Sequence, residues 1–388
     1  MTRHSEGARR SARPCEPEDD KDVTTSGVRL AVSSRGVVLG ALLALALGTT
    51  NKGARDSLLE TSRVAIVIPF TQSHGFDVMV ETLSLWNAFP PCETRREVVR
   101  FGRLHVFFHY NFNLDDRNGS FVKESVQKSW NALDPSVRAC FAAPTPTYFS
   151  AKLAADEDAY PTGPCLQHWR AFDFLQRRGE KFDHWFQFEP DVTPIRRGWG
   201  TELARLALAN QNCSEWWQLG SLALGDDIVG EFVVRGRRVP DFHLNGNALY
   251  CLKSNEYDDY RRRVRETFAP AGCFARTDRG LFGGFDTASY IYRADPRMFH
   301  AARFYAHRFR ASEYVLNYGD GASEAFIAAV VERHPRSFLV HSKLRLSSFA
   351  NASSLNRDEK TRRRVWSCDA HGCSWVVIGG ESLDARRV

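Results

Sequence analysis

Residues 64–70 (VAIVIPF) are the sequence feature that most constrains the fold of this chain. The run is apolar, rich in β-branched side chains and stopped by a proline. Such a run is typical of a strand buried on both faces, as in a parallel sheet covered by helices. A second run, residues 104–110, follows a helical pattern at 76–86, and further helical patterns lie at 125–133 and 198–209. Strands that alternate with helices predict an α/β domain.

A third apolar run, residues 184–188, ends in two carboxylates, Glu189 and Asp191, separated by a proline. The helix expected before it has Thr162 as candidate N-cap and Pro164 near its first position. Strand side chains at i and i+2 point the same way, so the carboxylates converge if the strand continues through them. Open α/β sheets bind ligands at this end of a strand, where two hard oxygen donors suit Mg2+ or Mn2+. The alternative is a solvated turn, because Pro and Asp are common turn residues.

The chain divides by composition into five segments. Residues 1–35 are polar and charged, which predicts a disordered tail. Residues 36–50 are apolar but shorter than the roughly 20 residues of a full membrane span. They form either a signal anchor or the core of a signal peptide, and the long charged head favours the anchor. A polar stem follows at 51–62, then a catalytic-looking domain at 63–347 and a polar, basic appendage at 348–388.

Cysteines and glycosylation sequons gather after the apolar segment. Eight of the nine cysteines lie there, together with the Asn-X-Ser sequons at Asn118, Asn212 and Asn351. This distribution suits an oxidising lumen, with disulfides and glycans, and a type II orientation in the Golgi or ER membrane. Cys368 and Cys373 either close a local hairpin by a disulfide or form a metal site with the histidine between them. The formal net charge of +6 is small for 388 residues and gives no case for nucleic acid as a partner.

Four further segments have the composition of ligand-handling loops: 216–221, 243–250, 283–286 and 338–343. In the second, two asparagines flank a glycine and can present amides to a polar ligand. The third delivers one carboxylate from a glycine-rich turn, and the fourth is a strand that ends in a histidine and a lysine. Each segment also has a plain structural explanation, because Asn-Gly turns and terminal histidines are common. A further pair, Asp226 and Asp227, is either a solvated loop or the second choice for base or metal ligand.

Taken in order, these segments resemble those of GT-A type, nucleotide-sugar-dependent glycosyltransferases of the Golgi and ER lumen. The resemblance covers about residues 63–347 and rests on the first strand, the acidic motif, the Gly-Phe-Asp loop and the late histidine-bearing strand. It implies a mixed, mainly parallel sheet flanked by helices, with a Rossmann-like half that binds the nucleotide sugar and an acceptor-side half. These enzymes usually carry Asp-X-Asp, whereas this chain has Glu-Pro-Asp, which leaves the geometry of a metal site open.

The resemblance also implies roles for particular residues. Glu189, Asp191 and His341 would hold Mn2+ or Mg2+ on the diphosphate of the donor. Asp286 would take the proton of the acceptor hydroxyl if the reaction inverts, and would only orient the acceptor if it retains. The expected donor- or acceptor-binding residues are His243, Asn245, Asn247, Gly220, Ser221, Lys343 and Trp217. Trp216 and Trp217 would stack on a sugar, with one of them in the core.

The expected function is therefore a metal-dependent transfer of a sugar from a nucleotide-sugar donor to a hydroxyl of a glycan or glycoprotein. The alternative is a GT-A-like domain without turnover that binds sugars or acts as a membrane scaffold, which the glutamate in the acidic motif keeps open. A lumenal hydrolase that uses the same two carboxylates as acid and base fits less well. Carboxylates two positions apart on one strand are too close to straddle a glycosidic bond.

Overall fold

The computed structural model falls into two compact units, Met1–Gly53 and Ala54–Val388, and the residues that it describes all lie in the second unit. These are residues 62–71, 76–178, 181–224, 231–234, 237–240, 242–269, 272–273, 284–294, 303–318, 332–341, 363–369 and 372–378. The expected tail, apolar segment and most of the stem therefore lie outside the described residues. Among those described, no helix is both long and apolar enough to span a bilayer.

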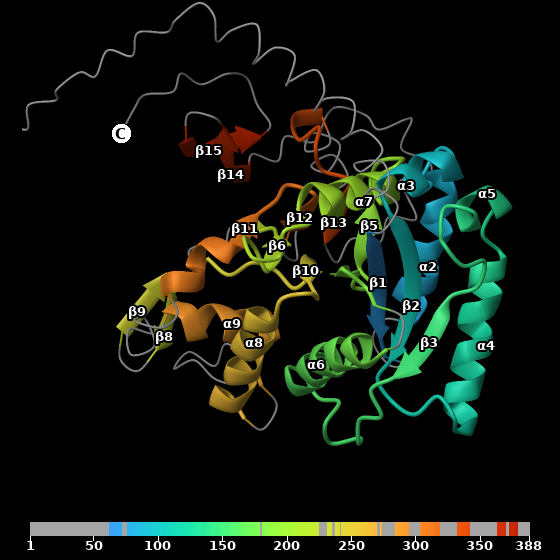
Figure 1. Cartoon of the computed structure of the whole chain (residues 1–388), viewed down its shortest axis with the longest axis horizontal. Helices are drawn as coiled ribbons and strands as arrows, with labels where there is room; N and C mark the ends of the chain where they lie inside the picture. Colours follow the sequence, from blue (N-terminus) through green and yellow to red (C-terminus); the bar gives the residue numbers. More distant parts are fainter. Residues whose placement is uncertain are drawn as a thin grey trace, which may run out of the picture. The chain divides into compact units, whose positions relative to one another are not determined.

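A seven-stranded sheet forms the centre of the second unit, in the order β11-β6-β10-β4-β1-β2-β3 (Figure 1). Neighbouring strands are parallel except at β10, which is antiparallel to both β4 and β6. The predicted α/β architecture with a mixed, mainly parallel sheet is therefore confirmed. The strands are β1 (Arg63–Phe70), β2 (Arg103–Tyr110), β3 (Thr147–Ser150), β4 (His184–Gln187), β6 (Gln218–Gly220), β10 (Leu249–Cys251) and β11 (Phe309–Ala311).

Helices cover both faces of this sheet because its side chains alternate between two apolar cores. Val64, Ile66 and Ile68 of β1 belong to one core, whereas Ala65 and Val67 belong to the other. The first core is closed by α2 (Phe76–Ala88), α3 (Arg95–Phe101), α4 (Arg117–Asn131), α5 (Pro135–Arg138) and α7 (Trp199–Ala209). The second is closed by α6 (Thr162–Arg177), α8 (Asn255–Thr267) and α9 (Phe285–Ala294), and the short η1 (Arg303–Arg308) precedes β11.

A second sheet of four strands has the order β5-β13-β12-β7. Its strands are β5 (Val192–Pro194), β7 (Ala223–Leu224), β12 (Val315–Tyr318) and β13 (Leu339–His341). β13 is antiparallel to β5, and the register places His341 opposite Val192. This pairing joins segments about 150 residues apart and brings a histidine next to the end of the acidic motif.

Several helix boundaries differ from those predicted. The helix expected at 125–133 begins already at Arg117, because the Asp116 carboxylate accepts a hydrogen bond from Gly119 N at 2.7 Å and caps it. Thr162 is the first residue of α6 and not its cap, since Pro161 occupies the N-cap without a side-chain hydrogen bond. Pro164 is therefore the third residue of α6.

Two antiparallel strand pairs complete the described elements. They are β8 (Glu231–Val234) with β9 (Arg237–Pro240), and β14 (Arg363–Asp369) with β15 (Gly372–Ile378). The register of the second pair places Cys368 opposite Cys373, so the expected hairpin is present in the C-terminal appendage. A disulfide within it stays a prediction.

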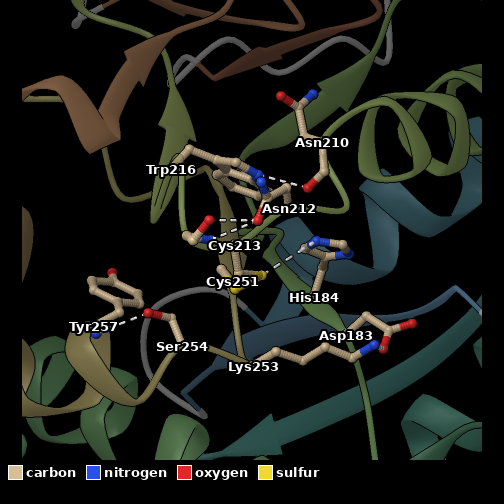
Figure 2. Close-up of a disulfide and its surroundings, with 11 residues drawn as sticks. Asp183, His184, Asn210, Asn212, Cys213, Trp216, Cys251, Lys253, Ser254 and Tyr257 are labelled. Carbon is tan, nitrogen blue, oxygen red and sulfur yellow. Dashed lines mark hydrogen bonds and ion pairs between the residues drawn. A yellow bond between two sulfur atoms is a disulfide. The ribbon is translucent and has the colours of Figure 1, made fainter.

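Three disulfides join the other cysteines after the apolar segment: Cys92–Cys140, Cys165–Cys273 and Cys213–Cys251. Disulfides of this kind persist in oxidising compartments, so they suggest a secretory-pathway domain. Figure 2 shows the third pair beside His184, the first residue of β4. The His184 ring stacks on Trp216, and its Nε2 lies 3.9 Å from Cys213 Sγ. The pair thus links the loop before β6 to β10 and holds the start of the strand that leads to the acidic motif.

Candidate metal centre

The acidic motif occupies a turn that directly follows β4. The strand ends at Gln187, so the expected continuation through both carboxylates is wrong. Val192 N instead donates to Glu189 O at 3.0 Å, which closes a turn, and the hydroxyl of Thr82 in α2 donates to Pro190 O at 2.6 Å. The turn still leaves the two carboxylates on one side, at the carboxyl end of a central strand.

His341 completes a cluster with these carboxylates. Its Nε2 lies 3.3 Å from Glu189 Oε2 and 3.3 Å from Asp191 Oδ1. The ligand atoms of the three side chains all lie within 4.8 Å of one another, and all three side chains are half-buried. On the other side of the ring, Nδ1 lies 2.6 Å from Asn317 Oδ1 of β12, which assigns the proton to Nδ1. Once the ring has lost its second proton, it presents the lone pair of Nε2 to the cluster, as metal coordination requires.

Charges in this cluster are strongly coupled. Burial lowers the pKa of His341, but the Asp191 and Glu189 carboxylates outweigh it and raise the pKa to about 9. Burial raises the pKa of Glu189 above its usual value, with the charge of His341 opposing and that of Asp191 reinforcing the shift. The two carboxylates are the oxygen donors that Mn2+ and Mg2+ prefer, and the imidazole adds a nitrogen donor of the kind that transition-metal ions accept. No other set of three His, Cys, Asp or Glu side chains with this geometry occurs within the described ranges.

Amide side chains fix both oxygens of Glu189. Gln187 Nε2 donates to Oε1 at 3.0 Å, and Asn247 Nδ2 donates to Oε2 at 2.8 Å. Asn247 Oδ1 also accepts from Glu189 N at 2.9 Å, and Asn245 Oδ1 in turn accepts from the backbone and side chain of Asn247. Asn247 is fully buried, and the expectation that it binds a donor or acceptor hydroxyl stays a prediction. The Asn-Gly-Asn segment orients the glutamate.

Asp286 lies close to this segment, although not on the expected turn. It is the second residue of α9 and accepts from Gly246 N at 3.0 Å and from Thr287 N at 2.8 Å. The Nε2 atom of His243, which is half-buried, lies 3.9 Å from Asp286 Oδ2. A Cβ at Gly246 would lie 2.5 Å from Cζ of Phe285, so only glycine allows this close approach.

The remaining expected binding residues lie elsewhere. Trp217 is fully buried and packs against Tyr257 and Tyr305, which is the core position expected for one of the two tryptophans; a stacking role for it stays a prediction. Gly220 ends β6 and Ser221 follows it, where its carbonyl accepts from Asn245 N. Lys343 and the pair Asp226 and Asp227 lie outside the described residues.

A cavity of about 240 Å³ opens beside the acidic motif. Its walls come from the ends of β1, β2 and β4, from α6 and from the acidic turn itself. Besides Glu189 and Asp191, the polar side chains in it are Thr71, His109, Tyr160, Gln167, His168 and Gln187, which the sequence had not singled out as binding residues. The sequence could have indicated His109, Gln167, His168 and Gln187, because each is a polar residue at a strand or helix position where the pattern predicts a buried apolar side chain.

No protein-family model matches this chain, and no curated protein matches it. Among solved structures, the apo form of mouse xyloside xylosyltransferase 1 aligns with a TM-score of 0.40 and 9% identity, over 72% of this chain and 98% of that one. The glycosyltransferase GlyE of Streptococcus pneumoniae TIGR4 aligns with a TM-score of 0.36, and the bifunctional glycosyltransferase WbbM with 0.38, each at 9% identity. Each of these two alignments covers 72% of this chain but only about half of the other, 54% and 46%. Because these similarities are remote, the function has to be judged from the chain's own residues.

Proposed function

We propose that this protein is a divalent-metal-dependent glycosyltransferase that moves a sugar from a nucleotide-sugar donor to a hydroxyl of a glycan or glycoprotein. The observation that carries the proposal is the cluster of Glu189, Asp191 and His341 at the end of a central strand, with a cavity beside it. Breaking the bond between sugar and phosphate builds negative charge on the leaving diphosphate. A site that gathers cation ligands next to a ligand-sized hollow suits that chemistry.

In this proposal the three residues of the cluster hold the metal, and the neighbouring amide side chains orient them. Glu189, Asp191 and His341 would hold Mn2+ or Mg2+, which supplies positive charge for the diphosphate. Asn317 holds the His341 ring with Nε2 toward the carboxylates, and Asn247 and Gln187 keep the Glu189 carboxylate in place. Because these outer contacts already order the three side chains, less conformational entropy is lost when the metal and the donor bind.

Asp286 and Lys343 complete the proposed machinery. Asp286 takes the proton of the acceptor hydroxyl if the reaction inverts, and orients the acceptor if it retains. Its two backbone hydrogen bonds and the neighbouring His243 already fix its orientation. Lys343 follows His341 by two positions and would neutralise a phosphate oxygen of the departing nucleotide.

The same proposal places the enzyme in the Golgi or ER membrane as a single-pass type II protein. Residues 36–50 would be the anchor and residues 63–347 the lumenal catalytic domain. The three disulfides support an oxidising compartment for this domain.

A domain that binds sugar nucleotides without turnover is the second candidate. It is favoured by one observation, that both oxygens of Glu189 already accept hydrogen bonds from protein amides. Such a domain would bind a metal and a nucleotide but release no nucleoside diphosphate from a nucleotide sugar.

A screen of nucleotide sugars tests the proposal. The full chain is incubated with each common donor and Mn2+, and the released nucleoside diphosphate is measured with and without EDTA. We expect metal-dependent release from at least one donor and its loss in Asp191→Asn, which keeps the shape but removes the charge. Metal-dependent nucleotide binding without release from any donor would favour the second candidate, and neither binding nor release would refute both.

A further inference from the structure

The cavity beside the acidic turn is lined by two buried side chains whose ring nitrogens have no hydrogen-bond partner among the described residues, His109 and Trp185. His109, at the end of β2, is 0% exposed, and neither its Nδ1 nor its Nε2 makes a hydrogen bond there. Buried polar atoms in proteins are nearly always paired, so an orphaned pair of ring nitrogens needs an explanation. A ligand that enters the cavity provides one.

The surroundings hold the His109 ring in place. The ring stacks on Phe149 of β3, with the ring centres 4.0 Å apart and the planes at 11°. Its backbone carbonyl accepts from Gln167 Nε2 of α6 at 2.7 Å, and the strand register fixes it opposite Pro69. Burial, with a smaller contribution from the Arg170 guanidinium, lowers the pKa of His109 to about 3. The ring is therefore neutral and offers one N–H donor and one acceptor.

The amide side chains of the cavity and His168 are already engaged in hydrogen bonds. Gln187 accepts from His168 Nδ1 at 2.7 Å and donates to Glu189, while Gln167 donates to the Phe70 and His109 carbonyls. The remaining wall is largely apolar, with aliphatic and aromatic side chains that include Val67, Phe70, Ala171 and Trp185. Among the buried side chains that line this cavity, the unmet hydrogen-bonding capacity thus lies at the two ring nitrogens of His109 and at the indole N–H of Trp185.

These features distinguish between the base and the transferred sugar of a nucleotide sugar. A sugar ring carries several hydroxyls, each of which needs a partner when buried, whereas the unpartnered buried groups of this cavity are only His109 and the Trp185 indole among the described residues. A nucleobase is flat, has apolar faces and carries a few donors and acceptors at its edge. At about 240 Å³ the cavity is below the usual range of roughly 300–1,000 Å³ for a whole drug-sized ligand, which suits a single ring system.

We propose that His109 is the residue that reads the base of the nucleotide, by hydrogen bonds from its ring to the edge of a base inserted beneath α6. This inference rests on the proposed function, because a metal ion held by Glu189, Asp191 and His341 would bind the diphosphate and so bring the base to the adjoining cavity. His109 is thereby a specificity-determining residue, separate from the residues that hold the metal.

The matched variants are His109→Phe and His105→Phe. The first keeps an aromatic ring against Phe149 but removes both nitrogens, and the second makes the same change on the same face of β2, at a position that does not line the cavity. Calorimetry in the presence of Mn2+ measures the binding of UDP, GDP, CDP and ADP, and of pyrophosphate as a base-free probe. We expect the wild type to prefer one base, and His109→Phe to bind that nucleotide about 10- to 100-fold more weakly, the usual effect of losing one or two hydrogen bonds.

Pyrophosphate and Mn2+ binding should be unchanged in His109→Phe, and all affinities should be unchanged in His105→Phe. If His109→Phe fails to fold, His109→Gln, which keeps a donor and an acceptor, should retain more than a tenth of the wild-type affinity while His109→Leu does not. If wild type and His109→Phe bind the nucleotide with equal affinity in calorimetry, the proposed role of His109 is overturned, but the proposed function is not affected. Competition by a sugar 1-phosphate that depends on His109 would show that the sugar occupies the cavity and would also overturn it. Failure of the wild type to bind any nucleotide with Mn2+ would refute the proposed function and the inference together.

Discussion

Replacing Asn247 with alanine tests whether the Asn-Gly-Asn segment orients the metal ligand. The substitution removes a hydrogen bond to the Glu189 carboxylate at 2.8 Å and leaves the backbone N–H of Glu189 without its acceptor. A hydrogen bond to a charged group contributes about 1.5–3 kcal/mol, and an orphaned buried donor costs about 1–3 kcal/mol. Because the Glu189 side chain is 28% exposed and water replaces part of the loss, we take the lower end of both ranges. The expected destabilisation is about 2.5 kcal/mol.

Two assays measure the effect. Denaturant unfolding in EDTA gives the change in the free energy of unfolding of the metal-free protein. Calorimetric titration with Mn2+ should show affinity reduced about tenfold, since outer contacts of metal ligands typically contribute 10- to 100-fold. The control is Asn210→Ala, which removes only a hydrogen bond to Leu206 O at the end of α7 and should cost about 1 kcal/mol without altering Mn2+ affinity. If Asn247→Ala unfolds within about 1 kcal/mol of the wild type and binds Mn2+ equally well, the orienting role is refuted.

Three further predictions follow from the same structure. In the metal-free protein the pKa of His341 is about 9, so the ring is protonated at pH 7 and must lose its proton to bind a metal. The Mn2+ affinity measured by calorimetry should therefore rise by up to about tenfold per pH unit toward pH 9 and then level off. An affinity that does not change with pH would contradict this role of His341. Trp217→Ala should lower the free energy of unfolding by about 3–5 kcal/mol, because the side chain is fully buried. The KM values for donor and acceptor should stay unchanged, and a selective rise in KM would support a stacking role for Trp217. Replacing both Cys213 and Cys251 by serine removes a crosslink between residues 38 positions apart, which the chain-entropy model values at about 4 kcal/mol. The melting temperature should therefore fall. An unchanged melting temperature would count against a structural disulfide.

The sequence predicted the sheet better than it predicted the site. The runs at 64–70 and 104–110 are apolar on both faces because helices cover both sides, and this pattern is visible without any long-range information. The carboxyl end of the 184–188 run was likewise recognisable, since Glu189 and Asp191 break an otherwise apolar segment. Their convergence was expected for the wrong reason: a turn closed between Glu189 and Val192 brings them together, not an extended strand.

What the sequence could not reveal depends on contacts between distant segments. Asn247 has the composition of a ligand-binding loop, and only the antiparallel pairing of β10 with β4 turns its amide onto Glu189. In the sequence His109 is one of several residues of an expected strand, and its burial depends on contacts with Phe149 of β3 and Gln167 of α6. Asp286 was expected on a flexible turn, because a glycine-rich stretch gives no sign that a helix begins at Phe285.

The measurement that tests the central claim most directly is electron paramagnetic resonance of bound Mn2+. Adding the protein should remove the signal of hydrated Mn2+, and pulsed spectra should show coupling to one histidine nitrogen. We predict that this coupling disappears in His341→Gln and that Asp191→Asn restores most of the free Mn2+ signal. A protein that leaves the hydrated signal unchanged, or a nitrogen coupling that survives in His341→Gln, would contradict a cation held by Glu189, Asp191 and His341.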